Sequence, residues 1–221
     1  MVDPARSPGA EALDGRRLYL CTADRPDLED FLEQCIRGGV DIVQLRDKHL
    51  EARDLIRRAE LAGAVCAGHG VPFVLNDRPD LALAARASGV HVGQDDTPAR
   101  VARQIVGPDA IVGLSTHAPS EWAAAEAEPA DYLSGGPVNP TPTKPGRPGT
   151  GIGYLKEVAS TRQGHADGRP WFVTGGVTPD TIPAMAAAGA RRFVVVRYLA
   201  ESDDPEAAAR ALLKVIDQET A

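Results

Sequence analysis

Hydrophobic and polar positions form a repeating pattern along the chain, in which each short apolar run is followed by a longer amphipathic segment. The apolar runs lie at residues 17–22, 41–46, 72–76, 89–93, 110–114, 132–135, 171–174 and 192–196. Most of them are nearly continuous, as is typical of strands that are buried on both faces. The pattern therefore predicts eight buried β-strands.

The segments between these runs have the spacing of amphipathic helices. Acidic residues open the segment 27–37, and apolar residues recur every three or four positions along 51–68. Further helices are predicted over 178–189 and from residue 204 onward, where Thr, Pro or Asp mark the first turn. Regular alternation of strands and helices indicates an α/β protein with a parallel sheet.

Eight strand–helix units in about 205 residues fit a compact (β/α)8 barrel, or TIM barrel, formed by a single domain over residues 16–221. A doubly wound open sheet is the alternative. The GxGxxG and GxxxxGK[ST] loops of nucleotide-binding open sheets are absent from the sequence, which favours the barrel. Residues 1–15 are rich in Pro, Ala, Gly and charge, and they predict a flexible N-terminal arm.

Composition narrows the class of partners. Twenty-four basic and 31 acidic residues give a formal net charge of −7, which argues against nucleic acid as a partner. The apolar runs are too short to cross a bilayer, and the N-terminus lacks the apolar stretch of a signal peptide. Cys21, Cys35 and Cys66 form no CxxC pair. We therefore expect a cytoplasmic protein with free thiols. We also expect small-molecule substrates and no membrane partner. A homo-oligomer is compatible with the sequence.

Cationic side chains follow two of the predicted strands, at the barrel face where active sites lie. Arg46 and Lys48 come directly after the second strand, and Lys144 lies in the long loop after the sixth. Three cations at one rim indicate a phosphate or diphosphate ligand. The alternative is a solvated basic edge.

Two carboxylates follow neighbouring strands. Asp77 comes after the third strand and Asp96 after the fourth, and adjacent parallel strands lie about 5 Å apart. Because no histidine or cysteine cluster accompanies them, they predict a Mg²⁺ site, with one ion per subunit, in preference to Zn²⁺. The alternative is that either carboxylate caps a helix.

Other residues at the predicted rim have more than one interpretation. Gly175–Gly176 after the seventh strand are typical of a phosphate cradle, but also of a bent strand end. The Gln44 amide is suited to the edge of a heterocycle. Ser115 lacks the GxSxG context of a hydrolase nucleophile. The Pro- and Gly-rich segment 135–153 predicts a binding loop or lid, and no role is assigned to His91.

The order and content of these motifs resemble those of thiamine-phosphate synthase. The motifs are QLRDK (44–48), ND (76–77), HVGQDD (91–96), GLS (113–115), GGPVNPTPTK (135–144) and GGV (175–177). The resemblance extends from about residue 17 to residue 215. It implies a (β/α)8 barrel and a Mg²⁺-dependent transferase of thiamine biosynthesis. Such an enzyme joins 4-amino-2-methyl-5-(diphosphooxymethyl)pyrimidine to 4-methyl-5-(2-phosphooxyethyl)thiazole, or its carboxylated form, giving thiamine phosphate and diphosphate.

The resemblance also implies a set of site residues. Those for the pyrimidine diphosphate are Gln44, Leu45, Arg46, Asp47, Lys48, Asn76, Ser115 and Lys144. Those for the thiazole phosphate are Thr141, Pro142, Thr143, Gly175, Gly176, Val196 and Arg197. The metal ligands would be Asp77 and Asp96, and the catalytic residues Arg46, Lys48, Ser115 and Lys144.

The chain departs from the common family pattern after the eighth strand. Many members have serine where this chain has Arg197. We expect Arg197 either to replace the hydroxyl with a charged contact to the thiazole phosphate, or to turn outward to an acid such as Glu201. Two other functions compete with the synthase: a thiazole tautomerase and a non-catalytic barrel that binds a phosphorylated ligand. Neither requires the paired carboxylates Asp77 and Asp96, which therefore favour the synthase.

Overall fold

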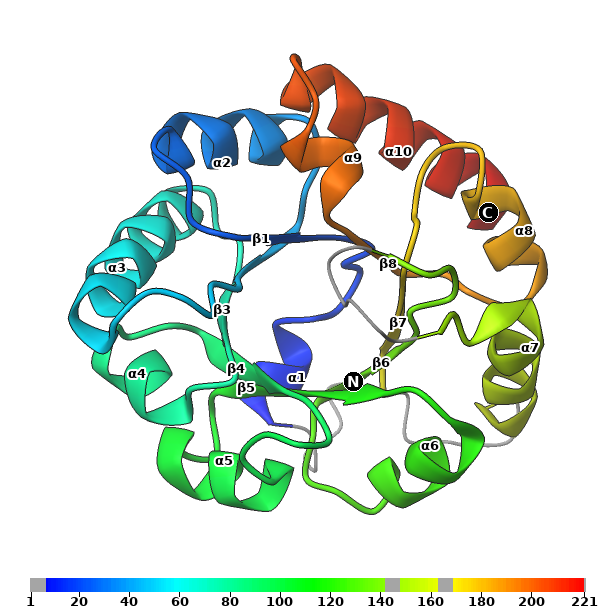
Figure 1. Cartoon of the computed structure of the whole chain (residues 1–221), viewed down its shortest axis with the longest axis horizontal. Coiled ribbons are helices and arrows are strands. Elements are labelled where there is room, and N and C mark those ends of the chain that lie inside the picture. Colours follow the sequence, from blue (N-terminus) through cyan, green and yellow to red (C-terminus); the bar gives the residue numbers. More distant parts are fainter. Residues whose placement is uncertain (1–6, 142–147, 163–168, 221) are drawn as a thin grey trace.

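The computed structural model describes residues 7–141, 148–162 and 169–220. Its strands are all parallel, and they close into a barrel in which each strand pairs with its neighbours in the sequence and β1 pairs with β8 (Figure 1). The strands are β1 (Leu18–Thr22), β2 (Ile42–Leu45), β3 (Phe73–Asn76), β4 (Gly89–Val92), β5 (Ile111–Thr116), β6 (Tyr132–Gly135), β7 (Trp171–Thr174) and β8 (Phe193–Val195). The predicted single-domain (β/α)8 barrel is confirmed, and no open sheet is formed.

Helices surround the barrel and alternate with the strands (Figure 1). They are α2 (Leu28–Arg37), α3 (Ala52–Gly68), α4 (Pro79–Ala84), α5 (Ala99–Val106), α6 (Pro119–Ala125), α7 (Gly151–Arg162), α8 (Ile182–Ala187), α9 (Arg197–Ala200) and α10 (Pro205–Thr220). The short helix α1 (Pro8–Glu11) precedes β1. The predicted helix over 178–189 is shorter than expected, because residues 178–181 form a turn in which the Thr181 hydroxyl accepts the Thr178 N–H.

Side chains alternate between two cores, because successive residues of a strand point to opposite faces. On β2, Val43 and Leu45 pack in the core shared with the surrounding helices. Ile42 packs in a separate core inside the barrel, and the Gln44 amide also lies there, since it bonds to Tyr19. This alternation brings every second residue of a strand end towards the barrel axis.

Three aromatic rings pack against one another in the barrel interior. Tyr19, Tyr132 and Phe172 contact one another edge to face, with centroids 5.4–5.9 Å apart. Glycine on the neighbouring strand makes room for them: a Cβ atom at Gly113 would lie 2.1 Å from Cζ of Tyr132. Close packing of this kind holds the rings in single orientations.

Residues 7–15 close the amino-terminal end of the barrel, so the expected flexible arm is wrong for this segment. Leu13 is fully buried and packs in the interior core. The Ser7 hydroxyl accepts the Ala10 N–H as an N-cap and donates to Asp131 at 2.7 Å. Two side chains, the capping Ser7 and the buried Leu13, attach this segment to the barrel. Neither was recognised from the sequence, because the segment is rich in Pro and Gly. Residues 1–6 lie outside the described part of the chain.

Two further observations concern the described ranges. None of their helices has the length and apolar character that a bilayer span requires. Cys21, Cys35 and Cys66 are buried, and no disulfide joins them.

Candidate active site

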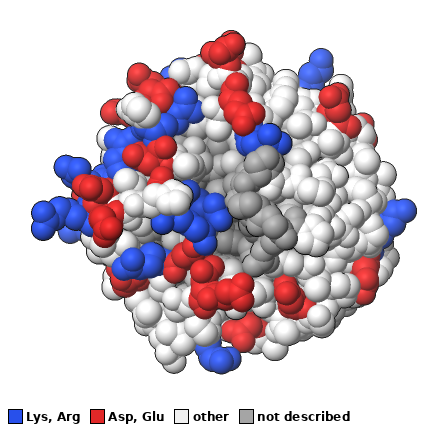
Figure 2. Space-filling view, viewed as in Figure 1, with Lys and Arg blue, Asp and Glu red and all other residues white. Residues whose placement is uncertain are grey.

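A cavity of about 310 Å³ opens at the carboxyl ends of the strands, and each of the eight strands contributes a residue to its lining. Figure 2 shows this face hollowed near its centre, with Lys, Arg, Asp and Glu side chains gathered on one side of the hollow. The cavity brings together many of the residues predicted from the sequence. They are Gln44, Arg46, Lys48, Asn76, Asp77, Asp96, Ser115, Thr141, Gly175, Gly176, Val196 and Arg197. Pro142, Thr143 and Lys144 lie outside the described residues.

One side of the cavity, here called the charged wall, consists of Arg46, Lys48, Asp77 and Asp96. Lys48 Nζ lies 3.0 Å from Asp77 Oδ2, and the Asp96 carboxyl is within hydrogen-bonding reach of Asp77. Burial raises the pKa of Asp77, and the Asp96 charge raises it further against the opposing effect of Lys48. Within the described ranges the Arg46 side chain has no ion-pair partner.

Neither carboxylate of the charged wall is a helix cap. The N-cap residue of α4 is Arg78 and that of α5 is Pro98. Asp96 Oδ2 instead accepts the Gly93 N–H at 2.9 Å, within its own loop. Asp77 has a φ of 62°, which non-glycine residues rarely adopt and which is often found at functional sites. Local backbone geometry therefore turns both carboxylates towards the cavity.

The charged wall has the donor chemistry of a magnesium site. Asp77 and Asp96 place carboxylate oxygens side by side. Burial is the main cause of the raised pKa of Asp77, and a cation bound here would neutralise the Asp96 charge that raises it further. In the described part of the chain no cluster of three or more His, Cys, Asp and Glu side chains could hold a metal. Mg²⁺ commonly takes only one or two protein carboxylates and completes its shell with phosphate oxygens and water. The two residues therefore fit this ion, provided that the substrate supplies further oxygens.

Two residues of the QLRDK motif lie outside the cavity, because the strand alternates. Leu45 is fully buried in the core shared with the helices. The Asp47 carboxylate accepts the N–H groups of His49 and Leu50, at 2.8 and 3.0 Å. Burial acts to raise the pKa of Asp47, but these backbone bonds outweigh it and the pKa is lowered. Leu45 and Asp47 therefore support the site without lining it.

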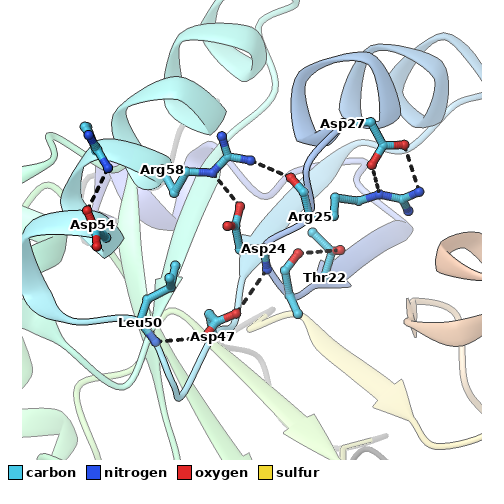
Figure 3. A network of polar contacts seen from close by, with 10 residues as sticks. Thr22, Asp24, Arg25, Asp27, Asp47, Leu50, Asp54 and Arg58 are labelled. Carbon is cyan, nitrogen blue, oxygen red and sulfur yellow. Dashed lines mark hydrogen bonds and ion pairs between the residues drawn. The ribbon is translucent and has the colours of Figure 1, made fainter.

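Asp47 also joins the loop after β2 to the loop after β1. Its second oxygen accepts the Asp24 N–H at 3.3 Å, and Arg58 of α3 binds both the Asp24 carboxylate and the Arg25 carbonyl (Figure 3). This network holds the segment from which Arg46 and Lys48 extend.

The opposite side of the cavity, here called the glycine wall, consists of Gly175, Gly176, Val196 and Arg197. Both glycines have positive φ, 101° and 72°. A Cβ atom at Gly175 would lie 2.5 Å from the backbone nitrogen of Val138. The glycines are thus required by the close approach of the loop after β6, and they also line the cavity. The two interpretations of the Gly–Gly pair are compatible.

Arg197 is the first residue of α9, and it is among the residues that line the cavity. The described residues include no ion-pair partner for it. Glu201 contacts Arg197 through the backbone bond from its N–H to the Arg197 carbonyl. The outward pair with Glu201 is not formed in the structure.

Beneath both walls lies a buried polar chain that was not predicted from the sequence. Its members are Cys21, Gln44, Tyr19, Tyr132, His91 and Ser115, in that order. His91 had been assigned no role. The strand period of two was the available signal, because residues two apart on a strand, such as Tyr19 and Cys21 on β1, point to the same side of the sheet.

These features define a (β/α)8 barrel whose cavity, at the carboxyl ends of the strands, has the cations, carboxylates and glycine turn suited to phosphorylated small molecules. Residues 18–199 match the family model described as thiamine monophosphate synthase. The chain therefore belongs to the thiamine monophosphate synthase family.

Individual relatives agree with this assignment. Thiamine-phosphate synthase of Mycobacterium sp. (strain KMS) is 46% identical over 217 residues, covering 93% of this chain and 94% of that protein. The enzyme of the same name from Thermobifida fusca is 50% identical over 204 residues, covering 90% and 92%. Among solved structures, thiamine phosphate pyrophosphorylase from Pyrococcus furiosus superposes with a TM-score of 0.82 and 26% identity, covering 96% of this chain and 99% of that one.

Proposed function

We propose that the protein is a thiamine-phosphate synthase, a transferase that joins the pyrimidine diphosphate to the thiazole phosphate and releases diphosphate. The observation that carries this proposal is the charged wall, in which Arg46 and Lys48 lie beside the neighbouring carboxylates Asp77 and Asp96. A leaving diphosphate is stabilised by positive charge. A pair of carboxylates next to cations is suited to bind a metal ion, which would supply further positive charge. Family membership supplies the identity of the two substrates.

Arg46 and Lys48 would bind the diphosphate as charge-assisted donors. As the carbon–oxygen bond breaks, both of its electrons leave with the diphosphate, so negative charge grows opposite these cations. Mg²⁺ held by Asp77 and Asp96 would supply further positive charge to the same oxygens. Lys48 pairs with Asp77 in the structure, and it would turn to the substrate when that carboxylate is otherwise neutralised.

The remaining chemistry requires positioning and the exclusion of water. The 4-amino group of the pyrimidine can donate electrons towards the methylene carbon, which stabilises the positive charge left there. The lone pair of the thiazole nitrogen then forms the new carbon–nitrogen bond. This route uses no protein nucleophile, and the cavity's main task is to hold two substrates in line and exclude water.

The glycine wall would hold the second phosphate. Gly175 and Gly176 bring backbone close to the cavity, and Arg197 contributes a cation where many family members have serine. Thr141 lines the cavity, and the next residues of its loop, 142–147, including Lys144, lie outside the described residues. The roles of Pro142, Thr143 and Lys144 are therefore part of this proposal on the strength of the family resemblance.

The decisive experiment mixes the purified protein, Mg²⁺ and both precursors, and detects thiamine phosphate by mass together with diphosphate release. Product formation that requires all three components supports the synthase. Isomerisation of the thiazole alone would indicate the tautomerase, and binding without turnover would indicate a non-catalytic barrel. Neither alternative is favoured by the relatives, which carry the synthase name. A cytoplasmic location remains a prediction, and light scattering would measure the oligomeric state.

A further inference from the structure

The floor of the cavity contains a continuous chain of hydrogen bonds. Gln44 Nε2 lies 2.7 Å from Tyr19 Oη, which lies 2.8 Å from Tyr132 Oη. Tyr132 Oη lies 2.8 Å from His91 Nδ1, and His91 Nε2 lies 2.8 Å from Ser115 Oγ. All of these side chains are buried, and all except Tyr132 also line the cavity. The chain thus connects the barrel interior to the ligand site.

The direction of the chain follows from its first member. An amide nitrogen can only donate, so Tyr19 Oη accepts from Gln44. Cys21 holds the amide in this orientation, because its thiol donates to Gln44 Oε1 at 3.3 Å. Among the described residues, Tyr19 Oη has one other polar partner, Tyr132. The single Tyr19 hydroxyl proton therefore points to Tyr132.

The same reasoning passes the direction on to the histidine. Tyr132 Oη accepts from Tyr19, so its own proton is donated to His91 Nδ1. Burial raises the pKa of Tyr132 well above its ordinary value and raises that of Tyr19 as well, so both hydroxyls keep their protons. An accepting Nδ1 requires a neutral imidazole with its proton on Nε2. His91 then donates to Ser115 Oγ.

We infer that the chain from Gln44 to His91 makes Ser115 a directed hydrogen-bond donor to the substrate. His91 and Tyr132 are positioning residues in this arrangement. Ser115 Oγ accepts from His91, and the structure's described residues offer no acceptor for its own proton, which is left for a ligand in the cavity.

The proposed function indicates which ligand atom accepts this proton, and this step rests on it. A donor to the pyrimidine ring would withdraw electrons from the carbon that becomes positive. A donor to a diphosphate oxygen would stabilise charge that grows during bond breaking. The Ser115 hydroxyl therefore serves the leaving group, and its contribution is expected in kcat more than in KM.

The first test does not depend on turnover. The ¹⁵N chemical shifts of His91 in the ligand-free protein report which ring nitrogen carries the proton, with His91→Gln used to assign the signal. The expected result is a neutral ring protonated at Nε2. A ring protonated at Nδ1, or at both nitrogens, would reverse the direction of the chain and overturn the inference.

The second test is a double-mutant cycle on kcat. Tyr132→Phe removes the donor to His91 Nδ1 and is expected to lower kcat by about tenfold, while leaving the thiazole KM nearly unchanged. In the Ser115→Ala background the same substitution is expected to have almost no further effect, because His91 then has no hydroxyl to orient. Equal losses in the two backgrounds would show that Tyr132 acts on structure alone.

Tyr154→Phe is the matched control. It removes another buried tyrosine hydroxyl, which donates to Thr116 Oγ1 at 2.8 Å, outside the cavity lining. We expect it to lower the unfolding temperature much as Tyr132→Phe does, while keeping kcat. If Tyr132→Phe does not fold, the ¹⁵N measurement on the unmodified protein decides. If that protein makes no thiamine phosphate, the proposed function fails, and the ¹⁵N shifts still test the hydrogen-bond chain.

Discussion

The two walls of the cavity would bind phosphate by different physical means. The charged wall uses long side chains and paired carboxylates held by loop hydrogen bonds. The glycine wall uses the backbone, brought close by residues that lack a Cβ atom, together with the single cation Arg197. Charge matters most where it changes during a reaction, and shape matters most where a group is only held. We therefore expect bond breaking at the charged wall and anchoring of the second phosphate at the glycine wall.

The largest effect is expected from removing either carboxylate of the charged wall. Asp77→Ala and Asp96→Ala should each lower Mg²⁺-dependent kcat by roughly 100- to 1,000-fold, because charge on the leaving diphosphate would lose its counter-ion. The fold should persist, since burial and Asp96 already disfavour the charged form of Asp77. Steady-state kinetics over a Mg²⁺ titration, with thermal unfolding as the fold control, measure both. Full activity in either variant would remove that residue from the metal site.

The next effect concerns the cation of the glycine wall. Arg197→Ser should raise the thiazole phosphate KM by roughly ten- to a hundredfold, corresponding to about 1.5–3 kcal/mol for a charge-assisted bond, and leave the pyrimidine KM nearly unchanged. Arg57→Ser is a matched control, because this substitution removes the same charge from the exposed surface of α3, away from the cavity. An unchanged thiazole KM would show that backbone groups alone hold this phosphate.

A third experiment separates shape from backbone conformation in the glycine wall. Gly175→Ala should destabilise the protein by about 2–3 kcal/mol, because it combines a positive φ with a clash against the loop after β6. Gly70→Ala has only the cost of the positive φ, which is 64° there, because no atom lies within 4 Å of the added Cβ. Urea unfolding of both variants gives the difference. Equal losses of stability would mean that close approach contributes nothing.

The smallest effect is expected behind the charged wall. Asp47→Asn weakens the bonds from His49, Leu50 and Asp24, and should cost about 1 kcal/mol of stability with a few-fold loss in kcat. Asp54→Asn on α3 is the control, because it loses only an exposed pair with Arg57. If Asp47→Asn raises the pyrimidine KM strongly without affecting stability, Asp47 contacts substrate directly.

Much of the active-site face could be predicted because a barrel converts sequence order into spatial order. Parallel strands that run in succession bring their carboxyl ends to one rim, so Arg46, Asp77, Asp96 and Ser115 meet although they are far apart in the chain. The strand boundaries agree with the structure to within two residues. Leu45 and Asp47 were misplaced because a motif was carried over whole, whereas a strand turns alternate residues away from the site.

The sequence by itself determined the periodicity, and with it the barrel, the rim and the chemical nature of the charged wall. Only the tertiary structure decided which polar groups meet inside the barrel. The bond from His91 to Tyr132 joins β4 to β6, and the bond from Tyr132 to Tyr19 crosses to β1. Such contacts depend on barrel closure and on the space left by Gly113, which local pattern does not encode. The same holds for Leu13, whose burial depends on an open barrel end that exists only once all eight strands have closed.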